Sequence, residues 1–196
     1  MNGKRVMKTK QPVALVAILV LLCCTVAGTL AYLVDKTPEV KNTFEPAKVT
    51  TSVLEDPFDG VTKKNVRIKN TGNIPAYIRA AVIINWADAQ GNVYGGATPE
   101  AGTDYKIDYN KSDWIQGSDG YYYCKIAVKS VKQDASGCYT PVLINSCYPV
   151  EGKAPEGYDL QVTILADGIQ SVPADAVEEA WPAIQVDNNG NLTAKD

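Results

Sequence analysis

Apolar and polar residues alternate along most of the chain beyond residue 60, and a period of two predicts β-strands. Over 76–86, apolar side chains fill one face of the predicted strand and most of the other, with Arg79 as its single charge. We therefore expect this strand at the centre of a sheet, buried on nearly both sides. Further strands are predicted over 65–69, 105–109, 121–129, 139–144 and 160–166.

The predicted fold class is all-β: a two-sheet antiparallel sandwich, jelly-roll-like, with one short helix near the C-terminus. The helix is expected over 173–181, because Pro173 suits a first helical turn. The segments 121–129 and 138–146 are expected to pair as a hairpin. The sandwich domain is predicted over 47–186, followed by a polar, frayed tail over 187–196.

Residues 1–31 have the pattern of a secretory signal peptide. Four cations precede an uncharged stretch over 11–34, and Thr29 and Ala31 are the small residues three and one before a cut that would leave Tyr32 first. The apolar run is also long enough to cross a bilayer of about 30 Å, so an uncleaved anchor stays open as an alternative. The protein is expected to be secreted, in the extracellular matrix or at the cell surface.

The charge balance narrows the range of partners. The whole chain carries −3, and its first 34 residues hold four cations and no acid, so the remainder carries near −7. Such a domain is repelled by nucleic acid and by anionic membranes. We expect no nucleic-acid partner, and contact with a membrane only through the N-terminal signal before cleavage.

Three cysteines lie beyond the signal segment, at Cys124, Cys138 and Cys147. Cys138 and Cys147 bracket a predicted strand, which would hold its ends about 30 Å apart. In the expected hairpin, Cys124 lies nearer Leu143 than either other cysteine. We predict unpaired, mostly buried thiols, with one disulfide as the alternative.

The candidate chemistry is sparse. The chain has no histidine, which excludes serine and cysteine triads and the His-Glu-x-x-His zinc site, so no catalytic, cofactor or metal residue is predicted. Four acids in a loop-rich region beside Trp114 leave a glycosidase as a weaker reading, although acids are common turn formers. A calcium-like run over 108–112 has Asp113 where the sharp turn needs glycine. Those four acids are Asp104, Asp108, Asp113 and Asp119.

Two features could serve contacts between subunits. Trp114, Tyr121 and Tyr123 are candidate interface aromatics, with ordinary cross-strand packing as the alternative. The arm over 32–46 could lie along a sheet edge of a neighbouring subunit, or form a leader or a first edge strand of its own domain. Its apolar residues are irregularly spaced between prolines: Leu33, Val34, Val40 and Phe44.

Several short segments, taken together, resemble the SipW-dependent biofilm-matrix proteins of the camelysin/TasA family, closest to its clostridial pilin-like branch. The resemblance covers most of the chain. It rests on Gly28-Thr29-Leu30-Ala31-Tyr32 before Asp35, Asn42-Thr43-Phe44, the run from Asn70-Thr71-Gly72-Asn73 to Arg79, Asn85-Trp86, Asp119-Gly120-Tyr121-Tyr122-Tyr123, Ile169-Gln170 and Glu179-Ala180-Trp181.

The resemblance implies export through a signal peptidase of the SipW type, a jelly-roll-like sandwich, and self-assembly into extracellular fibres by strand donation from the freed N-terminus. The residues over 32–46 would then be the donor arm. The three cysteines depart from the family pattern, and no sortase signal is present. A metalloprotease activity associated with camelysin is disfavoured by the absence of histidine.

The sequence therefore leads to one main hypothesis, a non-enzymatic secreted subunit that polymerises into fibres or biofilm matrix in a Gram-positive bacterium. The alternative is a monomeric surface-anchored module that binds glycan or peptide through Trp114 and the tyrosine-rich loops. Sequence alone leaves open whether the arm pairs within or between chains, whether a minor subunit is needed, and whether a Lys–Asn isopeptide bond is present.

Overall fold

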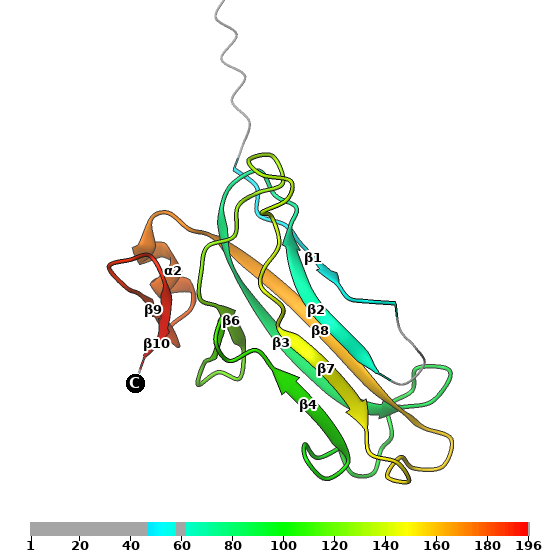
Figure 1. Ribbon diagram of the computed structural model, residues 1–196. Coiled ribbons are helices and arrows are strands. Elements are labelled where there is room, and N and C mark those ends of the chain that lie inside the picture. Colours follow the sequence, from blue (N-terminus) through cyan, green and yellow to red (C-terminus); the bar gives the residue numbers. More distant parts are fainter. Residues whose placement is uncertain (1–46, 58–61, 196) are drawn as a thin grey trace, which may run out of the picture. The chain divides into compact units, whose positions relative to one another are not determined.

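The computed structural model describes residues 47–57 and 62–195 (Figure 1). The signal segment and the arm over 32–46 lie outside the described residues. The described part confirms the predicted all-β sandwich with one short helix. The first sheet has the order β1 (Thr51–Leu54), β2 (Lys63–Asn70), β7 (Ile144–Pro149) and β4 (Tyr105–Tyr109), and the second has β5 (Trp114–Gln116), β6 (Tyr122–Cys124), β3 (Ala76–Ala87) and β8 (Asp159–Gln170).

The longest strand pair is β3 with β8. Their antiparallel register runs without a break from Ala76↔Gln170 to Ala87↔Asp159. On the inner face of β3, Ile78, Ala80 and Trp86 are buried, as the alternation predicts. The opposite face is buried at Tyr77 and at Ala87, near the two ends of the strand, but Ile83 between them is 39% exposed. The expectation of burial on nearly both faces is therefore wrong for the middle of β3.

The neighbour orders β2-β7-β4 and β8-β3-β6 are those of a jelly roll, whereas β1 and β5 pair differently. The predicted hairpin between 121–129 and 138–146 does not form, because β6 and β7 belong to opposite sheets. The chain between them crosses the end of the sandwich and makes only isolated bridges, Ala76↔Val128 and Lys69↔Tyr139. The strand expected over 139–144 accordingly begins only at Ile144.

The sandwich core lies between the two sheets. Its fully covered side chains include Val66 and Ile68 from β2, Ile78 from β3, and Leu143 and Ile144 around the start of β7. All three cysteines of the described residues are unpaired and buried, which confirms the prediction. Burial raises the pKa of the Cys124 thiol to about 12, so this group stays neutral.

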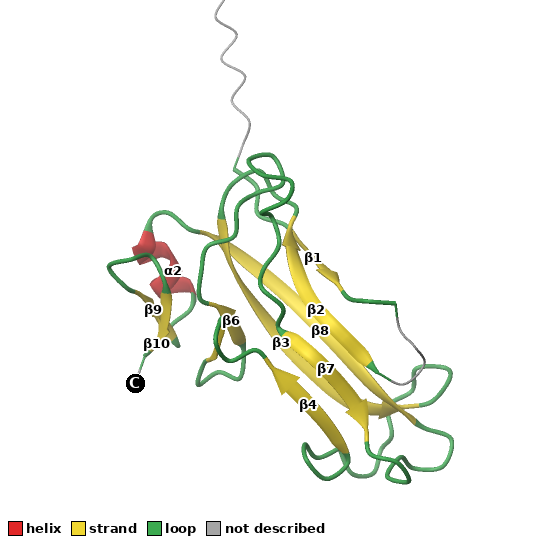
Figure 2. Ribbon diagram, in the orientation of Figure 1, coloured by secondary structure: helices red, strands yellow, loops and turns green. Residues whose placement is uncertain are grey.

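The C-terminal segment forms a small unit on the outer face of the second sheet (Figure 2). It consists of α2 (Ala174–Ala180), β9 (Ile184–Val186) and β10 (Leu192–Ala194). Its apolar residues join those of β3 and β6 in a second core: Tyr77, Tyr123, Val177, Trp181, Ile184 and Leu192. The predicted frayed tail is therefore wrong for β10, because Leu192 is 1% exposed and anchors the strand.

Arg79 lies beneath this C-terminal unit. Its guanidinium is 4.3 Å from the ring centroid of Tyr121 and 5.1 Å from that of Trp181, and its Nη2 pairs with Asp167 at 3.2 Å. Aromatic faces and a carboxylate thus hold the one charge of β3. This explains how the central strand accommodates an arginine.

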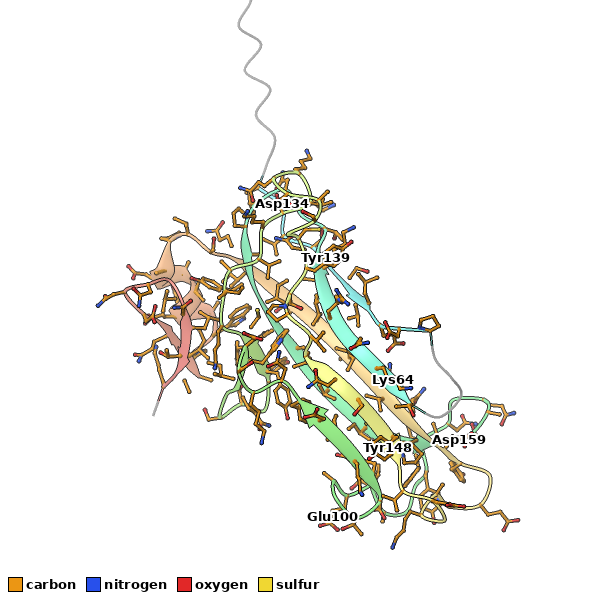
Figure 3. All side chains as sticks on the ribbon, in the orientation of Figure 1. Lys64, Glu100, Asp134, Tyr139, Tyr148 and Asp159 are labelled. Carbon is orange, nitrogen blue, oxygen red and sulfur yellow. The ribbon has the colours of Figure 1, made fainter. Side chains whose placement is uncertain are left out.

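The two ends of the sandwich carry different loops. The Asp134 end holds the described start of the domain over 47–50, the turn after Asn70 and the loop over 130–138 (Figure 3). The Glu100 end holds the loops over 88–104 and 150–158. Between them β3 extends over twelve residues, about 36 Å at the usual rise of a strand.

Asn70 organises the turn at the Asp134 end. Its side-chain amide donates to the carbonyls of Ile74 and Val128, and its Oδ1 accepts from the Gly72 amide. A Cβ at Gly72 would overlap the Lys48 carbonyl oxygen, so only glycine fits there. The Asn-Thr-Gly-Asn run therefore fixes the point at which the chain enters the domain.

Candidate assembly surface

The two sheets do not close against each other along one long side, between β2 and β8. We call this opening the seam. A cavity of about 340 Å³ occupies it, lined by residues from β2, β7, β8 and the end of β3. Its lining is Glu55, Lys63, Ala87, Asp88, Cys147, Asp159, Leu160, Gln161 and Val162. Lys64 and Asp159, near the starts of β2 and β8, lie towards this side of the domain (Figure 3).

Strand β1 fills only part of the seam. Thr51 Oγ1 donates to the Ala166 carbonyl at 3.1 Å, and Val49 and Thr51 pack over Gly168, where a Cβ would lie 2.8 Å from Val49 Cγ1. Beyond Leu54 the chain bends away from β8 and follows β2, since the Asp56 amide donates to the Lys64 carbonyl. The first half of β8 consequently has no strand on its outer side among the described residues.

The backbone groups on the free edge of β8 can be assigned from its register. The Ser171 amide donates to the Pro75 carbonyl, so the odd-numbered residues of β8 direct their backbone groups towards β3. The Ala166 carbonyl instead accepts from Thr51, on the outer edge of β8. Backbone groups alternate between the two edges of a strand. Leu160, Val162 and Ile164 therefore direct their N–H and C=O groups into the seam, where a further strand could bind them.

The same residues expose part of the apolar core. Leu160 and Ile164 point inward but are only half-buried. On β3, Val82 opposite Ile164 and Ile84 opposite Val162 are half-buried as well. At the other end of β3, Ile78 is fully covered. A sandwich that lacks one strand would show these two features together: half-covered apolar side chains and unpaired backbone groups beside them.

Charge and a thiol also border the seam. Lys63 Nζ lies 2.6 Å from Glu55 Oε2, an ion pair at its mouth. Cys147 lines the cavity although only 1% of its surface is exposed, and burial raises its pKa to about 11, so it is a neutral thiol. The floor of the seam is therefore uncharged and its rim is charged.

The candidate interface aromatics lie elsewhere. Trp114 is 2% exposed in the sandwich core, with its Nε1 donating to the Pro141 carbonyl at 3.2 Å. Tyr123 is fully buried in the second core, and its hydroxyl donates to Asp119 at 2.5 Å. These two rings have no surface to offer a neighbour, which corrects the interface expectation for them. Tyr121 is half-buried against Arg79.

A second opening lies on the opposite long side, between β4 and β5. Tyr109 and Tyr122 stack there with ring centroids 4.3 Å apart, beside a cavity of about 440 Å³. Asn110, Lys111 and Gln116 supply its polar lining. The sequence indicated the tyrosine-rich region but not this pair, because Tyr109 and Tyr122 lie on strands of opposite sheets.

The acids considered for catalysis are held separately by local hydrogen bonds. Asp104 accepts from the Glu100 amide, Asp108 from Asn145, Asp113 from Asn110, and Asp119 from Tyr123. Within the described residues, no group of three or more histidine, cysteine, aspartate or glutamate side chains could hold a metal ion. Three of these carboxylates serve as turn and loop contacts, and Asp108 makes a cross-strand contact between β4 and β7.

The described residues contain no helix with the length and apolar character to span a membrane. The signal-cleavage residues Thr29, Ala31 and Tyr32, and the arm residues Leu33, Val34, Val40 and Phe44, lie outside the described residues. The fold and the seam thus define a class, an antiparallel β-sandwich domain with an unpaired stretch of edge strand. Comparison with known proteins finds no matching family model, curated protein or solved structure.

Proposed function

We propose that this protein is a secreted structural subunit that polymerises into extracellular fibres or biofilm matrix by donating its N-terminal arm to the next subunit. The seam beside β8 is the observation that carries this proposal. It offers three residues with outward backbone groups, Leu160, Val162 and Ile164, above a half-covered apolar core. An added strand would satisfy the backbone and cover the core together.

The arm has the length that this role requires. Its fifteen residues, 32–46, reach up to about 50 Å when extended, whereas the open stretch over 159–164 needs about 20 Å. The arm joins the domain at the Asp134 end, where Lys48 donates its amide to Asn73. The seam opens towards the Glu100 end, where β3 finishes at Ala87.

This separation favours donation between copies arranged head to tail. Donor and acceptor are different surfaces of one chain, and such heterologous contacts build open filaments rather than closed dimers. Removal of residues 1–31 by a signal peptidase of the SipW type would free Tyr32 and so start assembly outside the cell. A minor subunit could occupy the first seam of a fibre.

Electron microscopy of purified proteins tests the proposal. The chain starting at Tyr32 is expected to form filaments, and the chain starting after Pro46 is expected to stay monomeric at the same concentration. Val162→Pro removes an outward N–H without touching the β3 pairing, so this variant should fold but not polymerise. Thr163→Pro is the matched control, since it removes a ladder hydrogen bond and should lower the melting temperature instead.

If the chain starting at Tyr32 stays monomeric, the proposed function is wrong. Filaments from Val162→Pro at the normal rate would place the acceptor elsewhere. The second opening favours one other candidate, a surface module that binds glycan through the stacked Tyr109 and Tyr122. Titration of a monomeric chain with soluble glycans, compared between wild type and Tyr122→Ala, tests that candidate.

A further inference from the structure

The two ends of the sandwich carry opposite charge. At the Asp134 end, the described segments 47–50, 69–76 and 128–140 contain four lysines and one acid. The acid, Asp134, is already paired with Lys129 at 3.2 Å. The lysines are Lys48, Lys69, Lys129 and Lys132. All but Lys69 are exposed, so this end presents a net positive surface.

The Glu100 end has the reverse balance. Its described segments 55–57, 62–64, 86–106 and 148–160 contain eight acids and four lysines. One of the lysines, Lys63, is paired with Glu55. The acids are Glu55, Asp56, Asp88, Glu100, Asp104, Glu151, Glu156 and Asp159. Asp88 keeps its charge, because hydrogen bonds from Asn92 and Gln90 lower its pKa.

We propose that these two ends bind each other in successive copies of this chain, so that charge sets the direction in which subunits join. The inference rests on the proposed function and adds a second contact to the donated arm. The arm begins at the basic end and the seam opens at the acidic end, so a copy oriented for strand donation brings opposite charges together. The reversed orientation would place like charges face to face.

The occupant is a second copy because both halves of the contact are on this chain. A basic surface alone would fit many anions, and an acidic surface alone many cations. Here each end complements the other, at opposite ends of strands about 36 Å long. Long-range attraction of this kind raises the rate of encounter and orients the partners, and salt weakens it because the Debye length is about 8 Å at 0.15 M.

Charge reversal at one end at a time tests the proposal, using the chain that starts at Tyr32. The first variant carries Lys129→Glu and Lys132→Glu, and the second carries Glu151→Lys and Glu156→Lys. All four side chains are exposed, so both variants should fold with melting curves close to wild type. Arg67→Glu with Lys111→Glu is the matched control for the first variant, with the same change in net charge away from both ends.

Light scattering at low salt measures the elongation rate. Each variant alone should elongate at least about tenfold more slowly than wild type, and the control should match wild type within a factor of about two. An equimolar mixture of the two variants should elongate faster than either variant alone, because the unchanged basic end of the second variant then meets the unchanged acidic end of the first. Raising the salt to 0.5 M should slow wild type and leave the single variants nearly unchanged.

Either variant elongating alone at the wild-type rate would overturn the charge pairing while leaving strand donation intact. A mixture as slow as its components would overturn it as well. If wild type itself forms no filaments under any condition, the proposed function is wrong. This outcome is measured on wild type alone, so it is distinguished from a failure of the charge pairing.

Discussion

Replacing Trp181 by alanine should release the C-terminal unit from the sandwich. Trp181 follows α2 and is 2% exposed, although it belongs to no strand of either main sheet. Its ring packs edge-on against Tyr123 at 5.4 Å between centroids, and Arg79 lies over it at 5.1 Å. The indole is thus the largest side chain that joins the unit to the second sheet.

The expected loss can be estimated from these contacts. Burying a tryptophan removes about 200 Å² from water, or about 5 kcal/mol at 25 cal/mol per Å², and alanine retains a small part of that. The edge-on ring pair and the cation contact each add about 1 kcal/mol. Measured truncations of buried tryptophan cost about 3–5 kcal/mol, so we expect about 4 kcal/mol for Trp181→Ala.

Hydrogen exchange separates local release from global unfolding. In Trp181→Ala, the amides of β9 and β10 should lose protection, while those of β2 and β7 should keep most of theirs. Leu165→Ala is the control, because that side chain is 55% exposed and its loss should change stability by less than about 0.5 kcal/mol. Equal loss of protection in β2 and β10 would refute the view that the C-terminal unit docks as a separate layer.

Three further predictions concern single groups. Cys147, with its pKa raised to about 11, should resist iodoacetamide at pH 7 and react once the protein is unfolded in urea. Asp187 accepts hydrogen bonds from the Asn191 and Asn189 backbone amides, which lower its pKa. Its stabilising contribution is therefore present at neutral pH and lost as the pH falls below 3.8, and Asp187→Asn should flatten that part of a melting-temperature profile. Gly72→Ala should cost about 2 kcal/mol in urea denaturation, because its Cβ meets the carbonyl of Lys48.

Strong alternation identified the strands that are paired along their whole length. The expected strand over 76–86 is β3 within one residue, and the helix expected over 173–181 is α2 within one residue at each end. The strand expected over 160–166 is longer in the structure, because Asp167 and Gly168 continue the pairing with β3 despite their turn-forming character. Pairing with a neighbouring strand sets the length of a strand more than the local propensity of its residues does.

Errors arose where the chain changes sheets. The segments 125–129 and 139–143 were predicted as parts of two paired strands, but they lie where the chain crosses the end of the sandwich. Their alternation only places single side chains such as Val128 and Leu143 in the core. Strands β1, β5, β9 and β10 were missed because four residues or fewer give no measurable period. Sequence therefore located the core but not the crossings.

The seam could not be predicted, because it is a property of two edges that are far apart in sequence. Lys63 and Asp159 line the same cavity only after both sheets have formed. The sequence did indicate an arm suited to edge pairing, although not which edge would accept it. The opposite charges of the two ends were also hidden, because acids and lysines alternate along the chain and separate only in the fold.

The free edge of β8 has a consequence for timing. Twelve register pairs with β3 hold this strand in its final form, and its first half needs no rearrangement before another strand can bind. In the proposed assembly, an acceptor that is always open cannot act as the switch, so control would rest with the supply of the donor arm. A short synthetic peptide with the arm's sequence would then act as a chain terminator, stopping growth in proportion to its concentration without altering the domain.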